Sequence, residues 1–334
     1  MKLVIKIIFM AFVFFLSTSF IIAQDAPELK WKICGTVQAM GSYAQTNTDT
    51  AQIGFGLHRV RLKTYFDYGK VSAFIQYSAK NNKIIDVRMT YKFLKTFNIR
   101  IGRFLGASPR AGALTSHLKI DIVERSFSAQ KWATNSVGSD FRDYGVAAFG
   151  KLGNFNYNLT VHNGNGATNI LASQKNTAKI LNQNIAISGM VSFKPKLVKG
   201  LEAGGYYGIG NANINEYSSY NAYIYWEPKP IRIKAEVIGL TNTKGNKDVT
   251  SLGYYVFGAL EITNAWELLA RYEKYDPNTD VNNNVTNLIT FGARYALFPA
   301  KISASKITIA YVLHDEEEVA INHNVLYVMF QTAF

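Results

Sequence analysis

Short segments in which apolar and polar residues alternate recur along almost the whole chain. In 155–162, FNYNLTVH, every second residue from Phe155 to Val161 is apolar, and the residues between them are polar. The stretch 231–237, IRIKAEV, repeats the pattern with basic and acidic residues on its polar side. Because a β-strand points successive side chains to opposite faces, each segment predicts a strand with one apolar and one polar face.

About sixteen such segments follow residue 24. The chain is 48% apolar, yet beyond residue 24 no run approaches the ~18 apolar residues that a membrane helix needs. Apolar residues spread so thinly are typical of a membrane barrel, which is apolar outside and wet inside. We therefore predict an all-β fold, a transmembrane antiparallel β-barrel of about sixteen strands. The predicted strands span 30–44, 52–66, 69–79, 82–94, 97–105, 142–151, 154–163, 181–194, 199–209, 216–227, 229–241, 249–262, 264–274, 285–298, 301–313 and 319–334.

The connections between the predicted strands alternate in length. Bacterial outer-membrane barrels have short periplasmic turns and long extracellular loops, so this pattern predicts an outer-membrane location. Aromatic residues also gather near the tight turns, as an interfacial girdle requires. The tight turns are 67–70, 94–96, 151–154, 227–230, 263–264 and 298–301, and the longest connections are 106–141 and 164–180. The girdle residues are Phe66, Tyr68, Phe93, Phe97, Phe193, Trp226 and Phe298.

The N-terminus fits a secreted protein. Its two lysines precede an apolar core at 7–16, and Ala23 supplies a cleavage point after small polar residues. This pattern predicts a secretory signal peptide over 1–24, which leaves 25–334 as one barrel domain. An uncleaved transmembrane anchor is the alternative.

The alternation continues to the last residue. Phe334, Phe330, Val328 and Leu326 share one parity. A barrel in lipid must pair its last strand with its first, because unsatisfied backbone groups are too costly there. A terminal phenylalanine after such a pattern also resembles the signal that outer-membrane barrels present to the barrel assembly machinery, which we expect as a partner together with outer-membrane lipid. The alternative is the last strand of a soluble β-sandwich.

The segment 106–141 is the longest connection. A loop of this length in a compact domain usually has a function, and the lumen of a sixteen-stranded barrel is too wide for side chains alone to fill. We therefore expect the loop to fold inward and to carry its charges to a constriction. A solvated surface cap is the alternative. The charged residues are Arg110, Lys119, Arg125 and Lys131, with Asp121 and Glu124.

Basic residues recur on the polar parity of the predicted strands. Arg59, Arg61 and Lys63 lie on one face of a single strand. Rings of arginine or lysine are a means by which anion pores select, and the donor fork of arginine suits phosphate oxygens. We therefore expect these residues to line a pore and to bind anions. The other basic residues expected in the lumen are Arg88, Lys92, Arg100, Arg232, Lys234, Arg271 and Arg294.

Acidic residues on the same parity leave a simpler alternative open. Asp86, Glu236, Glu267 and Glu273 would share the lumen and could neutralise the arginines in a cross-strand network. The net charge of +13 also includes many lysines at predicted periplasmic turns, outside the pore. The charge pattern therefore favours an anion channel without excluding a general, non-selective porin.

Five short motifs resemble the phosphate-selective porin O and P family. They are HRVRLKTYFDYGK at 58–70, IRIGRFL at 99–105, the triplet Glu124, Arg125 and Ser126, RDYGV at 142–146, and NGNG at 163–166. The resemblance implies a sixteen-stranded, trimeric outer-membrane channel for anions with its third loop in the pore. It implies that Arg59 and Arg61 are lumen arginines and that Arg125 is the loop arginine. Leu105 and His58 depart from the family pattern, which leaves phosphate specificity open.

Other functions have less support in the sequence. Ser116 and His117 are neighbours, but no nucleophile motif surrounds them, so we expect no enzyme activity. No histidine or cysteine pair has the spacing of metal ligands, and we expect no cofactor or metal. The single Cys34 excludes an internal disulfide, and secretion argues against nucleic acid as a partner. The sequence predicts passive diffusion of small inorganic anions, such as phosphate, with a non-conducting surface barrel (adhesin or scaffold) as the further alternative.

Overall fold

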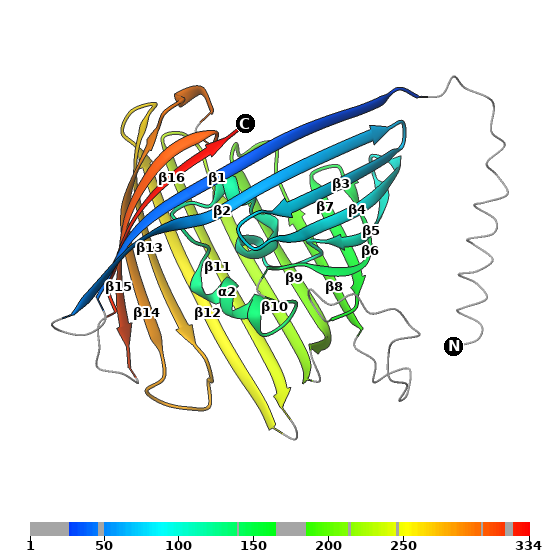
Figure 1. Ribbon diagram of the computed structural model, residues 1–334. Helices are drawn as coiled ribbons and strands as arrows, with labels where there is room; N and C mark the ends of the chain where they lie inside the picture. The colour runs from blue at the N-terminus through cyan, green and yellow to red at the C-terminus, as the bar shows by residue number, and fades with distance from the viewer. Residues whose placement is uncertain are drawn as a thin grey trace.

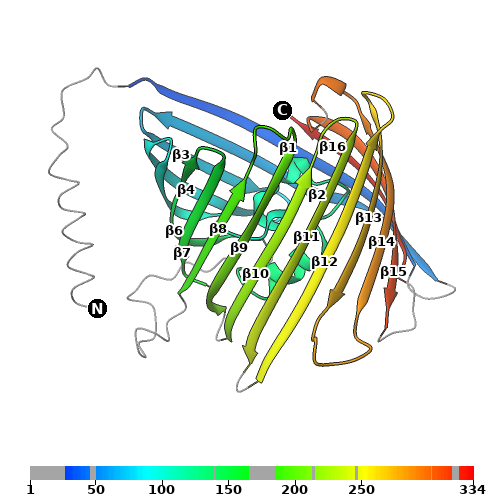
Figure 2. The ribbon, with the colours of Figure 1, turned by 180° about the vertical axis from the view of Figure 1, so that it is seen from behind.

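A computed structural model shows a closed antiparallel barrel (Figures 1 and 2). The structure describes residues 27–45, 50–138, 140–164, 185–212, 215–244, 247–301, 303–317 and 323–334. Each strand pairs with its neighbours in sequence, and β1 pairs with β16. The sixteen strands are β1 (Leu29–Gln45), β2 (Ala51–Tyr68), β3 (Val71–Ser78), β4 (Lys83–Leu94), β5 (Phe97–Phe104), β6 (Asp143–Leu152), β7 (Phe155–His162), β8 (Ala186–Phe193), β9 (Leu201–Ala212), β10 (Asn215–Trp226), β11 (Ile231–Lys244), β12 (Lys247–Glu261), β13 (Trp266–Asp276), β14 (Thr286–Ala296), β15 (Ser305–Glu316) and β16 (Val325–Ala333).

The predicted strands are confirmed. Each corresponds to one observed strand, and most ends agree within a few residues. The strand predicted at 301–313 starts later, because a turn that contains the short helix η5 (Pro299–Lys301) precedes β15. The predicted signal peptide, 1–24, and nearly all of the loop 164–180 lie outside the described residues. No helix in the described part of the chain is long and apolar enough to cross a membrane.

The barrel closes through its first and last strands, as the C-terminal pattern predicts. Thr36 pairs with Ala333 in the β1–β16 ladder. Beyond the ladder, the Phe334 N–H donates to the Gly35 carbonyl at 3.1 Å, and the Gly35 N–H donates to the Phe334 carbonyl at 2.9 Å. Every residue of the last strand is thus held by backbone bonds, which removes the open edge that lipid would not tolerate.

The two faces of the barrel have opposite polarity. On β16, Phe330 and Val328 are exposed on the outer face, whereas Gln331 is buried on the inner one. On β15, Thr308 is buried inside and Ile309 is exposed outside. The outside of the barrel is therefore apolar and the inside polar, which is the reverse of a soluble protein and the arrangement expected in lipid.

The connections are less regular than the sequence predicts. We call the end that carries 69–70, 95–96 and 153–154 the turn end, and the opposite end the loop end. The loop-end connection between β3 and β4 is only 79–82, and the turn-end connection between β8 and β9 is 194–200. The alternation in length therefore holds for the long loops but not for every connection, because a short hairpin can join two antiparallel strands at either end of the barrel.

The predicted aromatic girdle lies at the turn end. Tyr68, Phe193, Trp226 and Phe298 are exposed on the outer face there, while Phe66, Phe93 and Phe97 are half-buried. The rings of Phe93 and Phe97 lie 5.5 Å apart across the β4–β5 turn.

Candidate functional site

The long segment between β5 and β6 packs against the inner wall formed by β10–β13. Its elements are η1 (Arg110–Leu114), η2 (His117–Lys119) and α2 (Phe127–Thr134), and both ribbon views place α2 within the ring of strands. Trp132 of α2 is buried, donates to the Ser219 hydroxyl at 3.1 Å and meets the Tyr206 ring edge-on at 5.7 Å. The Phe127 N–H donates to Glu273 at 2.6 Å, and the Ala111 N–H donates to Glu236 at 2.9 Å.

The same segment also reaches the opposite seam of the barrel. The buried amine of Lys306, on β15, donates to the carbonyls of Leu118 and Ile120 at 3.2 and 3.3 Å. His117 lies between Thr36, 3.3 Å from its Nε2, and Arg61, 3.1 Å from its Nδ1. Because these contacts come from both sides of the barrel, the segment crosses the interior and narrows it.

A β-bulge brings two neighbouring residues of β2 to the loop. The β1–β2 register shifts between Gln38 and Ala39 and leaves His58 without a partner residue. A bulge turns two consecutive side chains toward one face. Accordingly, both His58 and Arg59 reach Glu124, at 2.9 and 2.7 Å. We call His58 and Arg59 the bulge pair.

Four basic residues of β11–β14 are neutralised by carboxylates, and we call this group the compensated wall. Arg232 contacts Asp121 at 2.9 Å and Glu267 at 2.6 Å, and Lys234 contacts Asp121 at 2.9 Å. Glu267 also pairs with Arg294. The simpler alternative, a cross-strand charge network, therefore holds on this side. The basic members are Arg232, Lys234, Arg271 and Arg294, and the acidic members are Asp121, Glu227, Glu267 and Glu273.

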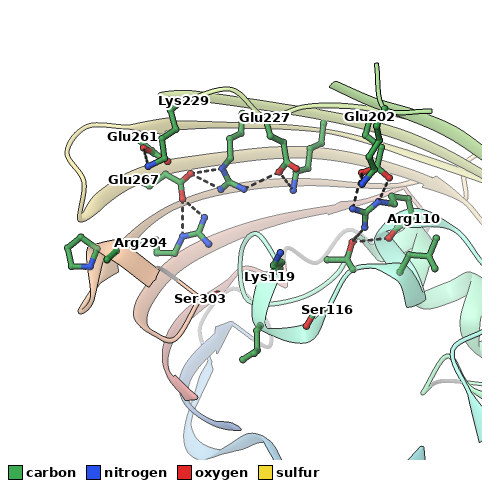
Figure 3. A pocket seen from close by; sticks show the side chains of 18 residues that line it. Arg110, Ser116, Lys119, Glu202, Glu227, Lys229, Glu261, Glu267, Arg294 and Ser303 are labelled. Carbon is green, nitrogen blue, oxygen red and sulfur yellow. Dashed lines mark hydrogen bonds and ion pairs between the residues drawn. The ribbon is translucent and has the colours of Figure 1, made fainter. Parts of the chain in front are cut away.

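A cavity of about 670 Å³ lies between this wall and the loop (Figure 3). Arg110 is anchored there by Glu202, at 3.0 and 3.3 Å from its Nε and Nη2. Lys119 also lines the cavity, and the described residues give its amine no ion pair. Most of the charge around this cavity is therefore balanced.

Arg125 is used inside the loop. Its Nε donates to the Gly112 carbonyl at 2.6 Å, its Nη2 donates to the Thr115 carbonyl at 2.8 Å, and its guanidinium lies 5.0 Å from the Phe141 ring. These contacts hold the loop in shape, so the expected loop arginine presents few donors to a passing solute.

Four other predicted residues lack carboxylate partners, and we call them the open basic wall: Arg61, Lys63, Arg88 and Arg100. Arg61 contacts His117, Arg88 lies 4.5 Å above the Phe74 ring, and Arg100 lies 4.4 Å from the Phe149 ring. Within the described ranges none of the four has an ion-pair partner within 4.0 Å. The basic residues thus divide into a balanced wall and an unbalanced one.

The ionisation states of Asp121, Glu124 and His117, in the loop, do not change near neutral pH. Burial raises the pKa of Asp121, but Lys234 and Arg232 outweigh burial and hold the pKa well below its usual range. Burial likewise opposes the ionisation of Glu124, yet the bulge pair lowers its pKa to about 2. Burial and Arg61 lower the pKa of His117, so its imidazole stays neutral and accepts from the arginine.

Several interior residues were not identified from the sequence. Arg142 pairs with Asp86 at 2.7 Å, both of them buried, and Glu202 and Glu227 serve as partners of predicted cations. Lys306 alternates with apolar residues in SKITIAYV, so the parity argument used for the other strands could have found it. In the described part of the chain no group of three or more histidine, cysteine or acidic residues could hold a metal ion.

Comparisons with known proteins agree with this geometry. The family model of the Gram-negative porins matches residues 10–313. Similar solved structures include an anion-selective porin from Comamonas acidovorans, with 14% identity, coverage of 92% of this chain and 100% of that one, and a TM-score of 0.70. OmpF of Salmonella typhi is 12% identical, with coverage of 91% of this chain and 98% of that one and a TM-score of 0.67. The trimer form of Vibrio cholerae OmpT is 11% identical, with coverage of 92% of this chain and 99% of that one and a TM-score of 0.65. At these identities the likeness shows the fold alone. A search of the curated proteins found no match.

Proposed function

This chain belongs to the Gram-negative porin family, and we propose that it is a channel that prefers small anions. Membership of the porin family and the sixteen-stranded barrel place the protein in the bacterial outer membrane as a diffusion channel rather than an enzyme. In such barrels the short turns face the periplasm, so the turn end is the periplasmic mouth.

The open basic wall is the observation that carries the anion preference. Arg61, Lys63, Arg88 and Arg100 supply positive charge, and none of them forms an ion pair within 4.0 Å in the described structure. Such charges lower the energy of an anion in a narrow wet path and raise that of a cation. A porin of Comamonas acidovorans with the same fold is described as anion-selective, and we propose the same preference here.

A general, non-selective porin is the second candidate. The compensated wall favours it, because balanced charges give little preference to either sign. Phosphate recognition stays a prediction, since Arg110 and Arg232 are paired with carboxylates and Arg125 is bonded to carbonyls. Only the open basic wall would then offer free guanidinium donors to a phosphate.

Assembly follows from the same proposal. We propose that residues 1–24 are a cleaved signal peptide, that the barrel assembly machinery inserts the mature chain, and that it forms a homotrimer. The structure of Vibrio cholerae OmpT is described as a trimer form, which supports this oligomeric state for a related fold.

Planar-bilayer recording tests the proposed preference. Under a gradient of potassium chloride, the reversal potential of the purified protein should have the sign of chloride permeation. Added phosphate should reduce the chloride current only if the open basic wall holds phosphate. A reversal potential of the potassium sign would refute the anion proposal, and a value near zero would favour the non-selective porin.

A further inference from the structure

A second cavity, of about 370 Å³, lies at the periplasmic mouth on the side of β2–β6. It is separate from the cavity in Figure 3, and its lining residues come from different strands. Arg88 and Arg100 both line it, together with the aromatic side chains of Tyr65, Phe74 and Phe149. Its volume falls within the range of small-molecule binding sites.

The two arginines form an unbalanced pair. Thr90 is directly opposite Arg100 in the β4–β5 register, and Arg88 is opposite Gly102, so Arg88 and Arg100 are diagonal neighbours on the inner face. Such neighbours lie within reach of each other's long side chains. The only hydrogen bond of Arg100 in the described structure is to the Thr90 hydroxyl, at 3.3 Å.

The nearby carboxylates are already engaged. Asp86 is held by Arg142 at 2.7 Å, and Asp67, at the edge of the cavity, is held by Lys92. Each guanidinium instead lies against a ring, Arg88 4.5 Å from Phe74 and Arg100 4.4 Å from Phe149. Stacking covers the faces of a guanidinium and leaves its N–H edges free for a ligand.

We propose that this cavity is a binding site for an aromatic carboxylate that enters the channel. The inference deepens the proposed anion channel and depends on it for access. Like charges on neighbouring strands repel each other, and an anion bound between Arg88 and Arg100 would relieve this repulsion. A planar carboxylate matches the arginine fork, and the aromatic walls would cover an aromatic body. Inorganic phosphate would satisfy the arginines but would leave the apolar walls without a partner.

Calorimetric titration of the detergent-solubilised full-length protein tests the proposal with three probes. Benzoate should bind about tenfold or more tightly than acetate, because only benzoate has a ring to bury. Phosphate at the same concentration should not displace benzoate. Arg88→Gln and Arg100→Gln should each weaken benzoate about tenfold or more, and Phe149→Leu should weaken benzoate but not acetate. Lys301→Gln, an equal loss of charge at an exposed periplasmic turn, should bind benzoate like the wild type.

Arg88→Lys separates the site from simple charge. It keeps the positive charge but loses the fork, so it should keep the wild-type reversal potential and lose benzoate affinity. Displacement of benzoate by equimolar phosphate, or unchanged affinity in Arg88→Lys, would overturn the proposal, as would absence of benzoate binding to the wild type. A protein that prefers chloride but does not bind benzoate refutes this site alone. One that binds benzoate but prefers potassium refutes the proposed function alone.

Discussion

Removal of the Trp132 side chain should release the α2 end of the loop from the inner wall. The indole is 1% exposed and donates to Ser219 at 3.1 Å. Truncation of a buried tryptophan costs about 3–5 kcal/mol, which corresponds to a shift of the docking equilibrium by roughly a hundredfold to a few thousandfold. The loop keeps its other anchors, such as Lys306, so the barrel itself should remain folded. We expect Trp132→Ala to increase single-channel conductance, because the released helix no longer narrows the interior.

Single-channel recording and limited trypsin digestion measure the release. Digestion should quicken at Lys131, which is already exposed on α2 but is protected by the docked helix. Trp226→Ala is the matched control, since Trp226 is 41% exposed on the outer face of β10 and should leave both readouts unchanged. If Trp132→Ala keeps wild-type conductance and trypsin resistance, packing of this indole does not hold the loop.

Three further predictions concern charge, pH and backbone conformation. Asp121→Asn should raise the chloride preference, because it leaves Arg232 with less negative charge beside it; an unchanged or reduced preference would contradict this. The pKa of Glu124 is lowered to about 2 from an ordinary 4.5, so its carboxylate keeps its stabilising contact with Arg59 above pH 4.5 and loses that contact only as the pH falls through about 2. Glu124 itself should therefore cause no change in conductance between about pH 7 and about pH 5. A transition in that range that persists in His58→Gln would refute the assignment. Gly102→Ala should destabilise the barrel by about 1–3 kcal/mol, because Gly102 has a φ of +123° and an added Cβ would overlap the Val87 carbonyl. Gly258→Ala is the control, because an added Cβ there meets open space. Equal unfolding midpoints of the two variants in urea would contradict this prediction.

The strands could be predicted because a barrel between lipid and water imposes a period of two on every segment. The same parity identified Arg61 and Arg232 as interior residues, and both face inward. The sequence could not distinguish them, since Arg232 meets Asp121, 111 residues away, only because the loop crosses the interior. Charge balance depends on the path of that loop, and no local pattern encodes this path.

The bulge in β2 had a signal in the sequence. Apolar residues fall on odd positions at Ile53, Phe55 and Leu57 and on even positions at Val60 and Leu62. That change of phase marks an extra residue, as a β-bulge requires, and it explains why His58 and Arg59 both reach Glu124. The family resemblance predicts that Arg125 is a pore arginine. In the structure its donors are occupied by the carbonyls of Gly112, in η1, and of Thr115, the residue that follows η1.

The most direct test compares two double variants by their reversal potentials in 0.1 M salt. Arg61→Gln with Lys63→Gln removes two cations of the open basic wall, whereas Arg232→Gln with Asp121→Asn removes one ion pair of the compensated wall. At about 5 Å in water, a unit positive charge lowers the energy of a chloride ion by roughly 0.8 kcal/mol. Screening at this salt concentration reduces the effect to about 0.5 kcal/mol. The same charge raises the energy of a potassium ion by an equal amount. The loss of one basic side chain should therefore lower the chloride-to-potassium permeability ratio about fivefold. The first variant should therefore lose most of its anion preference and the second should keep it. Equal changes in both variants, or an unchanged first variant, would contradict the claim that unbalanced arginine and lysine on one wall set the ion preference.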